Sequence, residues 1–179
     1  GSGRLAFVEI DHVTSADGNV VVRERQTIVY REAAPATATA TTPATTGASS
    51  PPPAAEAGPD LSGWTWHRDV TPSEVLLFRY SALTFNSHRI HYDLPYVTAV
   101  EGYPGLVVQG PLTASLLLDL CARQLGPDAL AGFAFRARSP AFAGQPLHLV
   151  GRRDGSEVML AALGHDGRTI ITATAKTRS

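Results

Sequence analysis

The chain has 179 residues, of which 44% are hydrophobic and 17% are charged, and its formal net charge is -1. This length can bury one hydrophobic core, and the nearly balanced charge, without a block of like charges, argues against nucleic acid as a partner. The apolar runs are shorter than the roughly 20 residues that span a bilayer. We therefore expect a soluble, cytoplasmic protein that binds neither nucleic acid nor a membrane.

The first piece of the chain, residues 1–33, predicts a β-hairpin. Two runs rich in Val and Ile flank the strong turn signal Asp17-Gly18-Asn19. A two-stranded hairpin alone is marginally stable in water, so we expect it to pair with a sheet elsewhere and to be the end of an incomplete domain. Residues 34–60 consist almost entirely of Ala, Thr, Pro, Ser and Gly, a composition that predicts a flexible linker.

The remaining piece, residues 61–179, begins with residues that predict a short helix and, further along, a longer one. Pro72 and the residues after it resemble a helix start with Pro at the first helical position, followed by the short helix VLLFRYSAL. A second helix is predicted from near Pro111 to Gly126-Pro127. Its apolar positions follow helical spacing and cover much of its circumference, which predicts a helix covered by a sheet. These positions are Leu112, Leu116, Leu117, Leu118, Leu120, Cys121 and Leu125.

The only cysteine, Cys121, lies inside this apolar helix. A single cysteine excludes a disulfide within the chain and zinc sites built from several cysteines. We expect a packed thiol there rather than a nucleophile.

The last third of the chain predicts antiparallel strands separated by turns that contain glycine. The segments are GFAFRARSPAF, QPLHLVGRRD, EVMLAALGHD and TIITATAKTR. One buried helix wrapped by antiparallel strands is an α+β arrangement.

A cluster of polar residues, TFNSHRIHYD at residues 84–93, stands out between apolar segments. His88, His91 and Asp93 are possible metal ligands, but neither helical nor strand spacing places all three on one side. A histidine here could instead be a general base, with Asn86 holding the water that it deprotonates. The third alternative is an ordinary surface loop whose polar groups are hydrogen-bonded.

A candidate anion site follows closely, where the segment GLVVQGP leads into the long helix. Backbone N–H groups at Gly110 and in the first helical turn lack helical partners, and the helix dipole favours negative charge there. This arrangement suits an oxyanion hole, although a tight turn between strand and helix explains the glycine equally well.

These residues resemble the MaoC-like, (R)-specific enoyl thioester hydratases and dehydratases of the hot-dog fold. Their motif is Ser-Gly-Asp-x-Asn-Pro-x-His-x-Asp, followed by a His-Gly or Gln-Gly step into the central helix. The motif's positions fall, in order, on Thr84, Phe85, Asn86, His88, Arg89, His91 and Asp93, and the step falls on Gln109-Gly110.

FRYSALTFNSHRIHYD and GLVVQGP are most similar to the subfamily that contains mesaconyl-CoA and itaconyl-CoA hydratases and mitochondrial-type 3-hydroxyacyl thioester dehydratases. GQP within SPAFAGQPLHL also resembles the family's Pro-x-x-x-Gly-Asp strand. Members often contain two hot-dog halves, and residues 1–33 resemble the last strands of a first half. The resemblance implies an antiparallel sheet wrapped around a central apolar helix, as part of a double hot-dog. It also implies a homodimer and a substrate carried on coenzyme A or an acyl carrier protein.

The resemblance also implies roles for individual residues. His91 would be the general base, Asn86 would orient the water, and the Gly110 N–H would bind the thioester oxygen. Asn86 replaces an aspartate, and an amide cannot accept a proton, so His91 would act alone. Arg89 would bind a second substrate carboxylate or, equally well, pair with Asp93. The residues expected to line the substrate pocket are Tyr80, His88, Arg89, Tyr96 and Gln109, and neither a metal nor a cofactor is expected.

Two other functions remain open from the sequence. A hot-dog thioesterase shares the fold but uses a carboxylate near the helix, for which Glu101 and Asp119 are the candidates. A noncatalytic thioester-binding or assembly subunit would fit Asn86 and an incomplete first half.

Overall fold

The structure is a computed structural model that describes residues 4–31 and 58–178. The chain forms two compact units, Gly1–Ser50 and Pro51–Ser179. Within the described residues, no helix combines the length and the apolar character that crossing a membrane requires. The predicted linker, residues 34–60, lies outside the described residues as far as residue 57.

The first unit contains the predicted hairpin, made of β1 (Leu5–Ala16) and β2 (Asn19–Arg31). Asp17 and Gly18 form the turn with φ angles of 50° and 78°, the left-handed values that a tight hairpin turn requires. Arg25 on β2 pairs with Asp11 on β1, with 2.7 Å between Nε and Oδ1.

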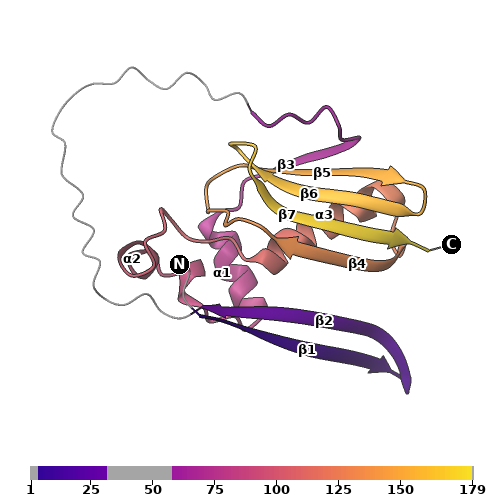
Figure 1. Cartoon of the computed structure of the whole chain (residues 1–179), viewed down its shortest axis with the longest axis horizontal. Coiled ribbons are helices and arrows are strands. Elements are labelled where there is room, and N and C mark those ends of the chain that lie inside the picture. The colour runs from indigo at the N-terminus through magenta and orange to yellow at the C-terminus, as the bar shows by residue number, and fades with distance from the viewer. Residues whose placement is uncertain (1–3, 32–57, 179) are drawn as a thin grey trace. The chain divides into compact units, whose positions relative to one another are not determined.

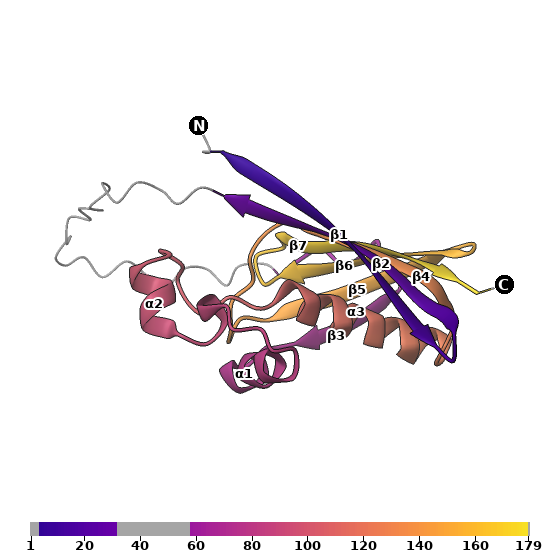
Figure 2. The ribbon, with the colours of Figure 1, turned by 90° about the horizontal axis from the view of Figure 1, so that it is seen from below.

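The second unit is a five-stranded antiparallel sheet with a long helix against one face (Figure 1, Figure 2). Four of the strands were predicted, although β4 ends at Ala137 instead of continuing to Phe142. The edge strand β3 was not predicted. The strands lie in the order β3-β5-β6-β7-β4, with bounds β3 (Trp66–Val70), β4 (Leu130–Ala137), β5 (Leu147–Asp154), β6 (Glu157–Gly164) and β7 (Thr169–Thr177).

The long helix, α3 (Gly110–Leu125), begins and ends close to the predicted residues. Gln109 precedes it with extended backbone, and Gly126 ends it with a φ of 92°. Most of the predicted apolar positions are buried against the sheet, while Leu118 is 37% exposed. Cys121 is fully buried, and burial raises the pKa of its thiol, so the prediction of a packed thiol is confirmed.

Between β3 and α3 the chain forms short helices that carry the polar cluster. They are α1 (Glu74–Leu83), the 3-10 turn η1 (Arg89–His91) and α2 (Leu94–Ala99). Ser73 caps α1 by accepting from the backbone N–H of Leu76. Pro72 therefore precedes the cap, and the prediction that it occupies the first helical position is wrong. The helix α2 was not predicted from the sequence. An antiparallel sheet wrapped around one central helix is the hot-dog fold, and it confirms the predicted α+β class.

Candidate active site

The polar cluster is a folded turn that hydrogen bonds of Asn86 hold in place. The Asn86 N–H donates to the carbonyl of Ser81 at 2.9 Å, and the Asn86 Oδ1 accepts from the His88 N–H at 3.1 Å. Phe85 has a φ of 52°, in the left-handed region that favours glycine. This explains why the resembling motif has glycine at that position. The Phe85 side chain is 95% exposed.

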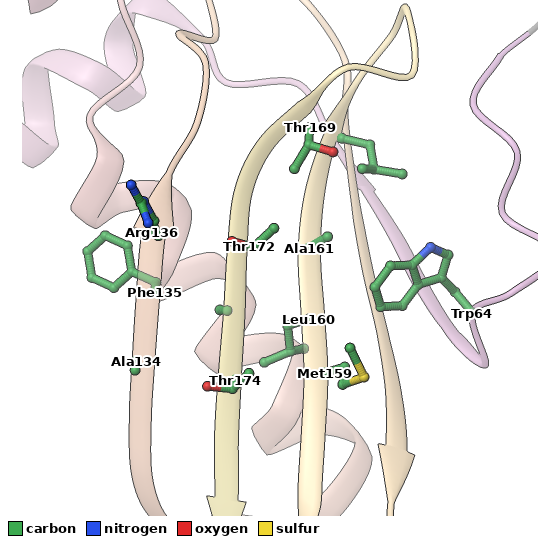
Figure 3. Close-up of a pocket in the computed structure, with 12 residues that line it drawn as sticks. Trp64, Ala134, Phe135, Arg136, Met159, Leu160, Ala161, Thr169, Thr172 and Thr174 are labelled. Carbon is green, nitrogen blue, oxygen red and sulfur yellow. The ribbon is translucent and has the colours of Figure 1, made fainter.

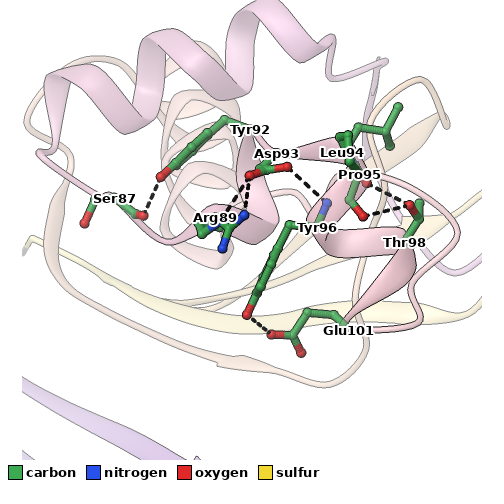
Figure 4. Close-up of polar contacts among 9 residues, drawn as sticks. All are labelled: Ser87, Arg89, Tyr92, Asp93, Leu94, Pro95, Tyr96, Thr98 and Glu101. Atoms are coloured by element: carbon green, nitrogen blue, oxygen red, sulfur yellow. Dashed lines mark hydrogen bonds and ion pairs between the residues drawn. The ribbon is translucent and has the colours of Figure 1, made fainter.

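Arg89 is engaged within the cluster (Figure 4). Its Nε and Nη2 donate to Asp93 Oδ2 at 3.0 and 2.8 Å, and its guanidinium lies 4.0 Å from the centre of the Tyr96 ring. The hydrogen bonds from Arg89 hold the pKa of Asp93 below its usual value. Asp93 Oδ1 also caps α2 through the Tyr96 N–H, and the Tyr96 hydroxyl donates to Glu101 at 2.8 Å. Of the two roles considered for Arg89, the structure shows the pairing with Asp93.

His91 is buried, with only 7% of its surface exposed. Its Nδ1 lies 2.6 Å from the carbonyl oxygen of Val107. A carbonyl oxygen can only accept a hydrogen bond, so Nδ1 carries the hydrogen and Nε2 has a free lone pair in the neutral ring. Burial lowers the pKa of His91 below its ordinary value of 6.5, so the ring is a neutral base at neutral pH.

The segment before α3 holds His91 through backbone contacts in both directions. The Val107 N–H donates to the carbonyl of Ile90 at 2.9 Å, while the Val107 carbonyl accepts from His91. On its other side the same segment bonds to the chain after β4, where the Val108 N–H donates to Ala141 at 2.8 Å. Residues 106–108 therefore tie His91 to the start of α3.

His91 and Gly110 line one groove of about 370 Å³. Gly110 is the first residue of α3, and an N–H at this position has no partner within the helix. A methyl group placed on Gly110 would meet no atom within 4 Å. The other lining residues are Ile90, Tyr103, Val107, Val108, Thr113, Ala137, Arg138, Ser139, Pro140, Ala141, Ile170 and Ile171. The structure thus brings the predicted base and the predicted oxyanion donor to one groove.

The other predicted site residues lie outside the set that lines this groove. Tyr80 packs against the core, and the ring of His88 lies 5.5 Å from that of His91, edge to face. Gln109 is 1% exposed, and its amide donates to the Leu77 carbonyl and to Ser81 Oγ, both at 2.9 Å. Those two contacts make Gln109 a link between α1 and α3. Asn86, Arg89 and Tyr96 remain in the turn described above.

The wall of the groove that comes from β4, β7 and the chain after β4 was not predicted from the sequence. Arg138 is the residue of consequence there, since it adds a charged side chain to a largely apolar lining. Its Nε lies 3.5 Å from Thr172 Oγ1. No local pattern marks Arg138, because its place in the wall of this groove depends on how the sheet folds over α3.

A second hollow, of about 380 Å³, lies over β4, β6 and β7 (Figure 3). Its lining includes Trp64, Phe135, Met159 and Thr172, with Arg136 as its charged side chain. The described residues that line it include no histidine or carboxylate that could act as a base, so it is not the candidate active site.

Comparisons with known proteins agree with this geometry. The family model of hydroxyacyl-thioester dehydratase type 2 (Htd2) matches residues 1–143. The mesaconyl-C(4)-CoA hydratase of Chloroflexus aurantiacus is 44% identical over 174 residues, which cover 97% of this chain and 56% of that protein. The mitochondrial hydroxyacyl-thioester dehydratase type 2 of Schizosaccharomyces pombe is 44% identical over 82 residues, covering 44% of this chain and 27% of that protein. The matched residues therefore span little more than half the length of the first of these relatives and about a quarter of the second.

Solved structures show the same fold at low identity. The (R)-hydratase from A. caviae involved in PHA biosynthesis matches with a TM-score of 0.57 and 18% identity, covering 63% of this chain and 91% of that one. The peroxisomal multifunctional enzyme type 2 of Drosophila melanogaster matches with a TM-score of 0.69 and 18% identity, covering 99% of this chain and 31% of that one. The second match includes both units, which supports a double hot-dog. Because the family model covers well over half of its residues, the chain belongs to the hydroxyacyl-thioester dehydratase type 2 family.

Proposed function

We propose that the protein is a hydro-lyase that reversibly adds water to a 2-enoyl thioester, on coenzyme A or an acyl carrier protein, to give the 3-hydroxyacyl thioester. One observation carries the proposal: a neutral buried imidazole with a free Nε2 and a helix N-terminal N–H line the same groove. The family and the relatives described above support it. We also propose that hot-dog halves pair and that the working form is a homodimer.

The proposed reaction uses His91 twice. Its Nε2 takes a proton from water while the water oxygen attacks the β carbon. The electrons of the double bond move to the thioester oxygen, which becomes an enolate stabilised by the Gly110 N–H and the N-terminus of α3. His91 then returns the proton to the α carbon. Asn86 remains the candidate for orienting the water: its Oδ1 accepts one hydrogen bond, from the His88 N–H, and its amide nitrogen offers two further hydrogens as donors.

The test is to incubate the protein with each member of a panel of crotonyl, mesaconyl and itaconyl coenzyme A and to monitor the absorbance of the enoyl thioester over time. We expect the absorbance to fall without release of free thiol. Thiol release would favour the thioesterase, but neither of its candidate carboxylates lines the groove. Asp119 pairs with Arg68 and Arg123, and Glu101 accepts from Tyr96. Binding without turnover of any panel member would favour a noncatalytic subunit.

The pH dependence of the reaction should follow His91. Its pKa in the folded protein lies below 6.5, so the base is present above that pKa and is lost as the pH falls through it. We expect kcat/KM to be level near neutrality and to drop about tenfold per pH unit on the acid side, with a midpoint below 6.5. Initial rates between about pH 5 and pH 8 measure this. An acid midpoint above 6.5 would contradict a buried neutral base.

We propose Arg138, rather than Arg89, as the partner of a second substrate carboxylate. Arg89 is engaged with Asp93, while Arg138 lines the groove. A charge-assisted hydrogen bond contributes about 1.5–3 kcal/mol, so Arg138→Gln should raise KM for mesaconyl coenzyme A roughly 10- to 100-fold and change that for crotonyl coenzyme A little.

Arg136→Gln is the matched control for Arg138, because Arg136 lies two residues earlier on β4 and outside this groove. Equal changes in KM for both substrates in the Arg138 variant would show that Arg138 does not recognise the second carboxylate.

A further inference from the structure

Three side chains that can bind a metal meet on the surface of the sheet, away from the groove. His67 and Asp69 lie two residues apart on the edge strand β3, so they project from the same face. His148 on β5 is the direct cross-strand neighbour of Asp69 in the antiparallel register. None of the three lines either hollow.

These side chains are already in contact. His67 Nε2 lies 2.7 Å from Asp69 Oδ1, and His148 Nδ1 lies 2.6 Å from the same oxygen. The two imidazole rings stack with their centres 6.0 Å apart and their planes 21° from parallel. One ligand atom from each of the three residues lies within 4.8 Å of the others.

The residues on the other face of β3 attach the strand to the rest of the domain. Trp66 and Val70 pack against the core, and Arg68 pairs with Asp119 on α3. The exposed fractions of the His67, Asp69 and His148 side chains are 44%, 59% and 18%. The cluster is therefore open to solvent and to an entering ion, and core packing does not explain it.

We propose that His67, Asp69 and His148 form a binding site for a divalent transition metal ion of the Zn²⁺ class. Two imidazole nitrogens and a carboxylate oxygen are proper zinc ligands, whereas Ca²⁺ and Mg²⁺ prefer a shell of oxygens. At the usual ligand distances of about 2.0–2.2 Å, tetrahedral ligand atoms lie roughly 3.4 Å apart, so the present contacts must open by less than about 1 Å.

Metal binding requires a tautomer change but no net loss of protons from neutral rings. The nitrogens that face Asp69 must present lone pairs, so the hydrogens move to Nδ1 of His67 and Nε2 of His148. The ion then takes three protein ligands, and the fourth position faces solvent. Since the ligands come from β3 and β5, the ion fastens the edge strand to the sheet.

The test uses untagged protein freed of metal with a chelator, then titrated with Zn²⁺ by calorimetry and with Co²⁺ by visible absorption. We expect one saturable site with a dissociation constant in the micromolar range or below. The visible bands of four-coordinate cobalt should appear, and saturation should raise the thermal midpoint by several degrees. His67→Ala, His148→Ala and Asp69→Asn should each weaken binding at least tenfold.

Matched controls place the ion. His165→Ala, on the exposed turn between β6 and β7, should bind like the parent protein. His88→Ala tests the other histidine pair, and loss of binding in that variant would overturn the proposal. So would binding that saturates only at millimolar metal, or binding that all three ligand variants retain. Circular dichroism without metal confirms that each variant is folded.

Discussion

Replacing His91 with glutamine should lower kcat for enoyl thioester hydration by about 10²- to 10⁴-fold, the contribution typical of one general base. Glutamine has a similar volume and can donate to the Val107 carbonyl, but it has no group that accepts a proton near neutral pH. The free Nε2 of His91 is the group that this substitution removes. Initial rates with the most active member of the thioester panel measure the effect.

The control for this variant is His165→Gln, which removes an exposed imidazole far along the chain. It should keep the turnover of the parent protein. Both proteins need unchanged thermal midpoints, because His91 is buried and its loss could act through stability. A folded His91→Gln protein with undiminished kcat would show that another group carries the proton.

Replacing Gly110 with proline should lower kcat by about 10²- to 10³-fold, the cost of removing one oxyanion donor. Proline deletes the N–H but suits this position otherwise, since the first helical residue tolerates proline. Gln109, just before it, has φ of -62° and ψ of 131°, the extended conformation that proline requires of its neighbour. The substitution therefore removes a hydrogen-bond donor with little change in the backbone.

Gly110→Ala is the control that distinguishes the effect of losing the N–H from the effect of adding side-chain volume. It keeps the N–H, and its methyl group meets no protein atom within 4 Å. We expect the alanine protein to keep kcat within a few-fold of the parent and to show any crowding of the substrate as a higher KM. If alanine and proline lower kcat equally, the N–H is not the oxyanion donor.

The helix that carries the site was predictable because its signals are local. Pro111 near the start, Gly126 at the end and apolar residues at helical spacing are all visible in the sequence. The strand β3 was missed for a physical reason. Its inward positions include Arg68, which reaches Asp119 instead of the apolar core, so the strand lacks the apolar alternation that identifies a half-buried strand.

The site itself could be predicted only in part. His91 and Gly110 are joined by a short segment of the chain, and both line the groove. The spacing of Arg89 and Asp93 allowed either role for Arg89, and the contact between them appears only in three dimensions. Gln109 and Arg138 depend on long-range packing. Gln109 contacts α1, and Arg138 lines the groove from the chain that follows β4.

Main-chain atoms hold His91 in position, and this affects which nearby side chains can be substituted. Its partner is the carbonyl of Val107, and the Val107 N–H bonds to another carbonyl. These atoms belong to the main chain, so substitution of the Val107 side chain leaves them in place. Val107, Val108 and Ile170 line the groove, so conservative changes in their size would alter its shape while the main-chain contact that fixes the proposed catalytic imidazole is kept.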